Sequence, residues 1–339
     1  MMNIVVLGAG ASRGASFAAR VKKICKPPMN SDFFTQLQRV LSKKHDKYVK
    51  ATINDVIKFF GVNWTITLEE YFTQIEFYRK VVPLTGERVI TSGDLRKARA
   101  NLMQALAAVL EESMFNEKCK FHTGLIEKLN PADTIISFNY DCLMDFSLVE
   151  RGSGKWNPHY GYGFPLQKWK LSGEKKWQPK GELATKSETI TLYKLHGSLH
   201  WQITNPSKAG AVGTIKLKER IYRQNENVLF TIIPPEWNKD AIENPVFLKI
   251  WKAAAQSLAK ATSLIFIGYS FSPTDLYASA LFRLALSKNK KVKQVVIVNP
   301  DKETRRRTRA IISNCLYGNA KLVQFDSFRE YAKSGFIGL

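Results

Sequence analysis

The sequence predicts an α/β protein built on a Rossmann-like, doubly wound and mostly parallel sheet. Six short runs rich in Val, Ile, Leu or Phe are typical of strands that are covered on both faces. Several runs are followed by segments with helical periodicity, and this alternation favours helices on both sides of one sheet. The six runs are NIVVLG (3–8), DTIISF (133–138), ITLYKL (190–195), SLIFIG (263–268), QVVIVN (294–299) and AKLVQF (320–325).

A large helical insertion is expected between the first two runs, over approximately residues 30–130. Three segments within it are amphipathic, as expected of helices that pack on one side. They are residues 30–44, 67–82 and 92–115. Candidate helix caps are Ser31 with Asp32, and Thr67 with Glu70.

Helices are also expected after the fourth and fifth runs. The segment 272–288 opens with Ser272-Pro273, and proline fits the first turn of a helix. Its apolar residues at near-helical spacing are Leu276, Leu281, Leu284 and Ala285. The Arg-rich segment 301–318 is closed by Gly318. A further strand is expected to end at Pro234-Pro235.

The bulk composition is that of one large soluble domain of 339 residues. No apolar run approaches the roughly 18 residues that span a bilayer, and the N-terminus lacks the basic start of a secretory signal. The cysteines lie far apart, so we expect neither a structural zinc site nor disulfides, and a cytoplasmic location. They are Cys25, Cys119, Cys142 and Cys315.

The chain carries 51 Lys and Arg against 29 Asp and Glu, a formal charge of +22. A positive surface attracts nucleic acid, phosphorylated ligands or an acidic protein, although a solvated surface is the alternative interpretation. A second insertion, at approximately 151–187, is basic and aromatic-rich, which suits either nucleic-acid contact or a pinned loop. Its aromatic residues are Trp156, Tyr160, Tyr162, Trp169 and Trp177. Further basic groups lie at 287–294 and 301–309.

The first strand run is followed by a glycine turn that contains Gly8, Gly10 and Ser12. Glycines let the backbone turn tightly and approach a diphosphate, and the start of the next helix supplies free N–H groups. The pattern departs from the G-x-G-x-x-G dinucleotide fingerprint, which needs glycine where the chain has Arg13. An ordinary strand-to-helix turn is the alternative.

Polar residues follow four other runs as well. They are Asn139 and Asp141 after the second run, His196 after the third, Gly268 and Ser270 after the fourth, and Asn299 after the fifth. In a parallel sheet all these ends lie on one edge, where open α/β sheets bind ligands. An imidazole such as His196 accepts a proton near neutral pH. A metal site shared with His200 is disfavoured, because on a strand the two side chains would lie about 13 Å apart.

The order of these segments resembles the sirtuin-like NAD-binding family. GAGAS, NYD, LHGS, GYS and VNP correspond to that family's Gly-Ala-Gly-x-Ser loop, Asn-x-Asp motif, His-Gly, Gly-x-Ser and Asn-bearing strand end. More narrowly, the chain resembles the bacterial sirtuin-like domains of anti-phage defence systems, which hydrolyse NAD. The resemblance covers the sheet, about half of the chain, and implies a single sirtuin-like domain over 1–339 that carries the two insertions.

The resemblance also implies a role for each candidate residue. The cofactor-binding residues would be Gly8, Gly10, Ser12, Asp141, Gly268, Ser270 and Asn299. The first three would cradle the diphosphate, Asp141 would face the nicotinamide, and the last three would hold the adenosine half. Asn139 would orient a water or the nicotinamide ribose, and His196 would act as the base.

The implied function is an NAD glycohydrolase that releases nicotinamide and ADP-ribose and is a regulated effector of anti-phage defence. NAD would be the substrate, with no metal and no membrane. Expected partners are further copies of the chain and a DNA-translocating ATPase or another defence protein. Protein deacylation is disfavoured, because the paired cysteines of a zinc module are missing and Phe138 replaces the family's Gln. A nucleotide-sensing module that docks nucleic acid or an ATPase, and an ADP-ribosyltransferase, are the alternatives.

Overall fold

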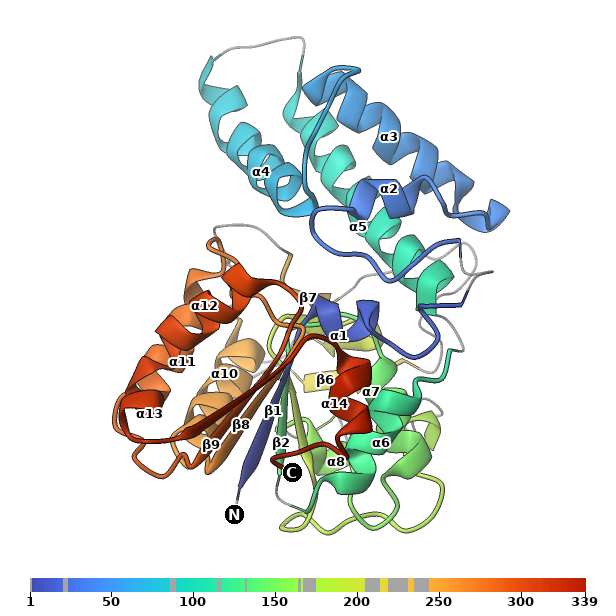
Figure 1. The fold of residues 1–339 in the computed structure, drawn as a ribbon. Helices are drawn as coiled ribbons and strands as arrows, with labels where there is room; N and C mark the ends of the chain where they lie inside the picture. The colour runs from blue at the N-terminus through green and yellow to red at the C-terminus, as the bar shows by residue number, and fades with distance from the viewer. Residues whose placement is uncertain are drawn as a thin grey trace.

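The computed structural model (Figure 1) describes residues 2–20, 24–85, 90–114, 117–131, 133–163, 166, 175–204, 214–218, 231–234 and 244–339. At its centre lies a six-stranded sheet in the order β10-β9-β8-β1-β2-β3. Every neighbouring pair in this sheet is parallel. Its strands are β1 (Asn3–Leu7), β2 (Thr134–Ser137), β3 (Thr191–Lys194), β8 (Ser263–Ile267), β9 (Gln294–Val298) and β10 (Lys321–Phe325). All six predicted strands, and the predicted fold class, are therefore confirmed.

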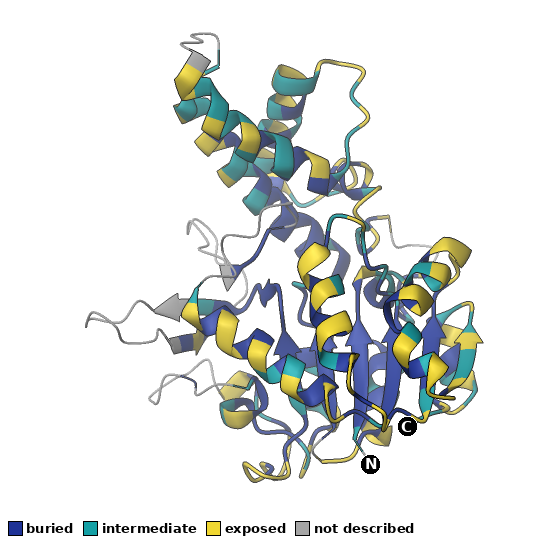
Figure 2. Ribbon diagram, turned by 90° about the vertical axis from the view of Figure 1, so that its left-hand side faces the viewer, coloured by how far each residue is buried: buried dark blue, intermediate teal, exposed yellow. Residues whose placement is uncertain are grey.

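Helices cover both faces of the sheet, as a doubly wound fold requires (Figure 1). One face carries α6 (Lys120–Lys128), α7 (Leu143–Arg151) and α14 (Phe328–Lys333), and the other carries α10 (Pro245–Leu258), α11 (Leu276–Leu286), α12 (Lys302–Ile311) and α13 (Ser313–Tyr317). Five of the strands are buried and the edge strand β10 is only partly covered, while the helices expose their outer faces (Figure 2). The strand order reverses beside β1, whose neighbours are β2 and β8. Ligands of such sheets bind at the carboxyl ends of the strands at this switch point.

The helical insertion stands above the carboxyl ends of the strands (Figure 1). It contains α2 (Phe33–Leu37), a 3-10 turn (Lys43–His45), α3 (Asp46–Phe60), α4 (Leu68–Thr85) and α5 (Ser92–Met114). The helices predicted at 67–82 and 92–115 are confirmed, whereas the one predicted at 30–44 is wrong except for α2 and the 3-10 turn. Helix α3 was not predicted from the sequence. Thr67 and Glu70 do form a capping box, in which each backbone N–H donates to the other side chain.

Asp32 precedes α2 but does not cap it through its side chain. Its carboxylate instead accepts a hydrogen bond from the N–H of Met29 and pairs with Arg13. Asp32 therefore joins the entrance of the insertion to the short helix α1 (Ala9–Arg13) that follows β1.

The helix predicted after the fourth run is confirmed as α11, but it starts later than predicted. The helix begins at Leu276 after the N-cap Asp275, so Ser272-Pro273 lies in the loop before it. Leu276 and Leu284 are 68% and 77% exposed, because the sheet-facing side of α11 is formed by its other apolar residues. The buried residues are Ala278, Leu281, Phe282 and Leu286.

Three of the five aromatic residues noted in the 151–187 segment form core rather than a stacking surface, and Tyr160 is 40% exposed. Trp156, Tyr162 and Trp177 are fully buried, which contradicts the nucleic-acid interpretation of this segment for those three residues. Trp169 lies outside the described residues. Nearby, α8 spans Pro158–Gly161, and two small antiparallel pairs join β4 (Gly197–Ser198) to β7 (Thr231–Ile232) and β5 (Trp201–Thr204) to β6 (Thr214–Leu217). None of the helices in the described part of the chain is long and apolar enough to cross a membrane.

The turns after β1 and β8 touch through their backbones. The N–H of Gly10 donates to the carbonyl of Gly268 at 2.9 Å. A Cβ on Gly10 would lie 2.7 Å from Cα of Gly268, and a Cβ on Gly268 would lie 2.2 Å from the nitrogen of Ala11. Gly268 also has a φ of +61°, which L side chains rarely adopt. Close approach and backbone conformation therefore both require glycine here.

We expect Gly268→Ala to destabilise the protein by about 2–4 kcal/mol, since overpacking adds to the cost of a left-handed conformation. Urea unfolding would measure the loss. Gly154→Ala is a matched control, because Gly154 has a similar positive φ (+67°) but nothing within 4 Å of the added Cβ. Equal losses in the two variants would show that packing between the turns contributes nothing.

Candidate active site

A cavity of about 200 Å³ lies at the carboxyl edge of the sheet, beneath the helical insertion. Its floor is formed by residues that directly follow the strands, and its roof by α4, α5 and the segment 27–30. The lining residues are Gly8, Ala9, Ser12, Pro27, Pro28, Met29, Asn30, Leu68, Glu69, Leu106, Leu110, Met114, Phe138, Asn139, Tyr140, Asp141, His196, Gly268, Tyr269 and Ser270. The register explains this convergence, because Leu7 lies beside both Ser137 and Ile267, so the strand ends are level.

Most of the residues predicted for the site meet in this cavity. Those that line it are Gly8, Ser12, Asn139, Asp141, His196, Gly268 and Ser270. Gly10 is not among the lining residues and packs against Gly268 instead. Asn299 is also absent from the lining, and its side-chain oxygen accepts a hydrogen bond from the N–H of Asp301 at 3.0 Å, in the turn that leads into α12.

A hydrogen-bonded triad ties the glycine turn to the loop after β2. Ser12 Oγ donates to Asp141 Oδ2 at 2.7 Å, and Asn139 Nδ2 lies 3.2 Å from Ser12 Oγ. Asn139 Nδ2 also donates to the carbonyl of Gly8 at 3.0 Å. None of the described residues donates to Asn139 Oδ1, so that oxygen is available to a ligand in the cavity.

Three N–H groups of the glycine turn donate hydrogen bonds to backbone carbonyls of the protein itself. Those of Gly8, Gly10 and Ala11 donate to the carbonyls of Ile267, Gly268 and Gly8, at 3.1, 2.9 and 2.8 Å. The glycines are thus explained by the contact with the Gly268 turn, and a phosphate would have to displace these bonds to use the same donors.

His196 sits in an aromatic cage beside one carboxylate. Its ring packs edge-on against Phe138, with centroids 5.1 Å apart, and lies 6.2 Å from Tyr140 in a stacked arrangement. His196 Nε2 is 3.7 Å from Asp275 Oδ2, which also accepts a hydrogen bond from Tyr269 at 2.8 Å. Sequence analysis missed Asp275; its only sequence signal was a Thr-Asp pair before a helix, which is typical of an ordinary N-cap.

Glu69 of the helical insertion reaches the loop that follows β8. This buried carboxylate lines the cavity and accepts hydrogen bonds from the hydroxyls of Ser272, at 3.2 Å, and Thr274. Thr274 directly precedes Asp275, so the insertion holds the loop that supplies the partner of His196. Nothing in the pattern of α4 distinguished Glu69 from a surface residue.

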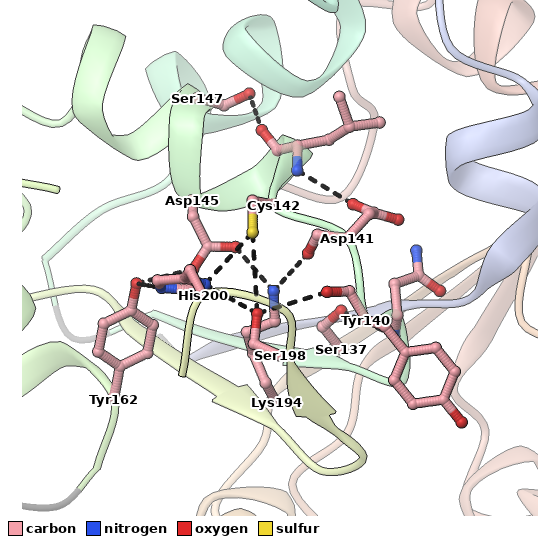
Figure 3. Close-up of polar contacts among 12 residues, drawn as sticks. Ser137, Tyr140, Asp141, Cys142, Asp145, Ser147, Tyr162, Lys194, Ser198 and His200 are labelled. Carbon is pink, nitrogen blue, oxygen red and sulfur yellow. Dashed lines mark hydrogen bonds and ion pairs between the residues drawn. The ribbon is translucent and has the colours of Figure 1, made fainter. Parts of the chain in front are cut away.

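Behind the cavity lies a fully buried polar network (Figure 3). Lys194 Nζ donates to Asp145 at 2.8 Å and to the carbonyl of Asp141. Tyr162 donates to Asp145 at 2.7 Å and contacts His200 Nε2 at 3.1 Å. The network joins β3 to the first turn of α7, directly below the Asn139–Asp141 loop.

Cys142, Asp145 and His200 have the residue types of a metal site and lie close together. However, both nitrogens of His200 already have partners, since Nδ1 is 2.9 Å from Ser198 Oγ and Nε2 contacts Tyr162. The Lys194 ammonium beside Asp145 also repels a cation. The arrangement is therefore better described as a network in which these groups form hydrogen bonds with one another and with their neighbours.

Burial and the Lys194–Asp145 ion pair together determine which groups of this network are charged. It lowers the pKa of His200 to about 3 and raises that of Cys142 to about 12, so both are neutral. Burial also opposes ionisation of Asp145, but the Lys194 ammonium outweighs it and keeps the carboxyl pKa below its ordinary value. Lys194 is likewise desolvated, and Asp145 nevertheless raises its pKa. The pair is therefore charged inside the protein.

We expect His200 to make stability depend on pH. Between about pH 6.5 and pH 3 the unfolded chain binds a proton at this residue that the folded protein does not, so stability falls as pH falls. Unfolding free energies of wild type should drop by up to about 1.4 kcal/mol per pH unit more than those of His200→Asn. His159→Asn, at a partly exposed position, controls for general histidine effects. Parallel curves for wild type and His200→Asn would contradict this.

The family model of the SIR2-like domain matches residues 133–317, which is more than half of the 339 residues. No curated protein shows a significant match. The matched stretch runs from β2 to α13 and includes Asn139 and His196, while the glycine turn precedes it. SIR2-like domains are in general NAD-dependent enzymes, and the predicted sirtuin-like resemblance is confirmed. The chain belongs to the SIR2-like domain family.

Proposed function

We propose that this protein is an NAD glycohydrolase, which cleaves NAD to nicotinamide and ADP-ribose. The observation that carries the proposal is the convergence of Asn139, Asp141 and His196 with the glycine turn on one cavity. A cavity of about 200 Å³ is smaller than the roughly 300–1,000 Å³ of sites for drug-sized ligands. It suits the nicotinamide-ribose end of the substrate, where the reacting bond lies.

In the proposed reaction, the bond between C1′ of the ribose and the pyridinium nitrogen breaks, and its electron pair neutralises the departing nicotinamide. Water forms the new bond to C1′, and its proton passes to His196 and then to solvent. The free oxygen of Asn139 would orient this water or a ribose hydroxyl. Fixed dipoles and a positioned nucleophile lower the barrier to an oxocarbenium-like transition state.

Asp275 would act through His196 as a positioning residue. It does not line the cavity, but its carboxylate lies 3.7 Å from the imidazole and stabilises the imidazolium that forms during the reaction. Depletion of NAD in anti-phage defence is the biological role that we attach to this activity, on the resemblance of the motifs alone. Self-assembly and an ATPase partner remain predictions.

We expect Asn139→Ala and His196→Ala each to reduce nicotinamide release from NAD by at least about 100-fold, because each removes a group that acts on the reacting bond. Chromatographic detection of nicotinamide measures this. Asn63→Ala, at an exposed position of the insertion, should retain wild-type activity. The proposal fails if His196→Ala is as active as wild type, or if wild type releases no nicotinamide in any state of assembly.

Asp275→Asn should lower kcat about tenfold or more and leave KM nearly unchanged, since the residue touches His196 and not the substrate. Asparagine caps helices as well as aspartate does, so α11 should stay intact. Steady-state kinetics and thermal unfolding test this together. A loss confined to KM, or one explained by unfolding, would remove Asp275 from the mechanism.

A further inference from the structure

The edge of the sheet opposite the cavity carries a concentration of lysines. They stand in the turns that lead into β8, β9 and β10, and we call them the lysine edge. Its members are Lys260, Lys288, Lys290, Lys291, Lys293 and Lys321, all exposed. The N–H of Lys293 donates to the carbonyl of Thr262 at 2.9 Å, and the N–H of Lys321 to that of Lys293 at 2.8 Å. These bonds hold the three turns side by side.

The charge of these lysines is not met by close ion pairs within the described residues. None of the six lysines forms an ion pair with a described residue. The only acidic residues between positions 244 and 325 are Asp275, Asp301 and Glu303. All three stand at the starts of α11 and α12, at the carboxyl edge of the sheet. The lysine edge therefore has a local positive field.

Basic side chains without ion pairs are not a general property of the chain, as the helical insertion shows. There, Lys58 pairs with Asp94 at 3.1 Å, and Arg79 and Arg99 both pair with Glu76, at 2.5 and 2.6 Å. These three cations of the insertion have acidic partners close by, whereas the members of the lysine edge form no ion pair with a described residue.

An exposed aromatic ring accompanies the lysines. Tyr317 ends α13, is 87% exposed and precedes Lys321 by four residues. The chain between them turns tightly, with Gly318 N–H donating to the carbonyl of Asn314 at 3.3 Å and Asn319 at a φ of +67°. The outward-facing side of this helical layer is the one seen in Figure 2. A tyrosine so exposed contributes nothing to the core and offers a free ring face.

We propose that the lysine edge binds single-stranded nucleic acid. Lysine ammonium groups neutralise phosphates irrespective of sequence, and an exposed aromatic ring beside them stacks on an unpaired base. A duplex presents no unstacked base to Tyr317, so a single strand is the nucleic acid that uses both the charge and the ring. The inference does not depend on the proposed NAD chemistry, because the site lies at the other end of the strands.

Fluorescence anisotropy with a labelled single-stranded DNA or RNA of about 15 nucleotides tests the proposal in the full chain. Replacing Lys288, Lys290 and Lys291 together by Gln should weaken binding at least about tenfold at about 50 mM salt and make the log–log salt slope shallower by about 2. Tyr317→Ala should weaken binding about tenfold without changing the slope. NAD cleavage should be unaffected in both.

The matched control removes the same charge elsewhere, by replacing Lys43, Lys47 and Lys80 of the insertion with Gln; these lysines are also exposed. It should bind within about twofold of wild type. If both triple variants weaken binding equally, binding depends only on the net charge of the protein, and the proposal is overturned. Absence of binding would overturn it too. Tight binding of polyglutamate or duplex DNA that is insensitive to Tyr317→Ala would assign the edge to another partner.

Discussion

The buried ion pair between Lys194 and Asp145 constrains the whole candidate site. Removing either charge from water costs several kcal/mol, so the pair persists only if both groups are fully hydrogen-bonded. Lys194 meets this condition by donating to Asp145 and to the backbone carbonyl of Asp141. The end of β3 and the first turn of α7 are thereby fixed relative to one another. The loop that carries Asn139 leads from β2 into α7 and is held by the same bond from Lys194 to the carbonyl of Asp141.

The other side of the cavity depends on backbone contact rather than charge. The turn after β1 reaches the Gly268 turn so closely that neither tolerates a Cβ, and Asn139 bridges from the β2 loop to the carbonyl of Gly8. Glu69 then joins the roof to the loop before Asp275. A ligand in the cavity therefore meets groups held by three different kinds of constraint: an ion pair, close packing of glycines and a hydrogen-bonded insertion.

The sheet and the meeting of its polar strand ends could be predicted from the sequence, because buried parallel strands leave a local apolar signature and their ends share one edge. Residues that act through distant contacts leave no such trace. Glu69 and Thr274 are 205 positions apart in the chain, and in the sequence pattern Lys194 is only a polar residue next to the end of an apolar run. The exposure of Leu284 and the burial of Trp177 could not be predicted for the same reason, since periodicity and composition do not say which face a neighbouring element covers.

The candidate active site lies at the carboxyl edge of the sheet, and the lysine edge lies at the opposite end of the strands. Helix α11 runs from one end to the other. Asp275, beside His196, caps its first turn, and Lys288 follows its last. An 11-residue helix is about 16 Å long and rigid over that length. A ligand shifts an equilibrium between two states by no more than its difference in affinity for them. A polyanion on the lysine edge can therefore alter the environment of His196 only if α11 has two positions and the polyanion binds one of them more tightly. Glu69 opposes such a shift, since it holds the loop at the start of α11 against the insertion.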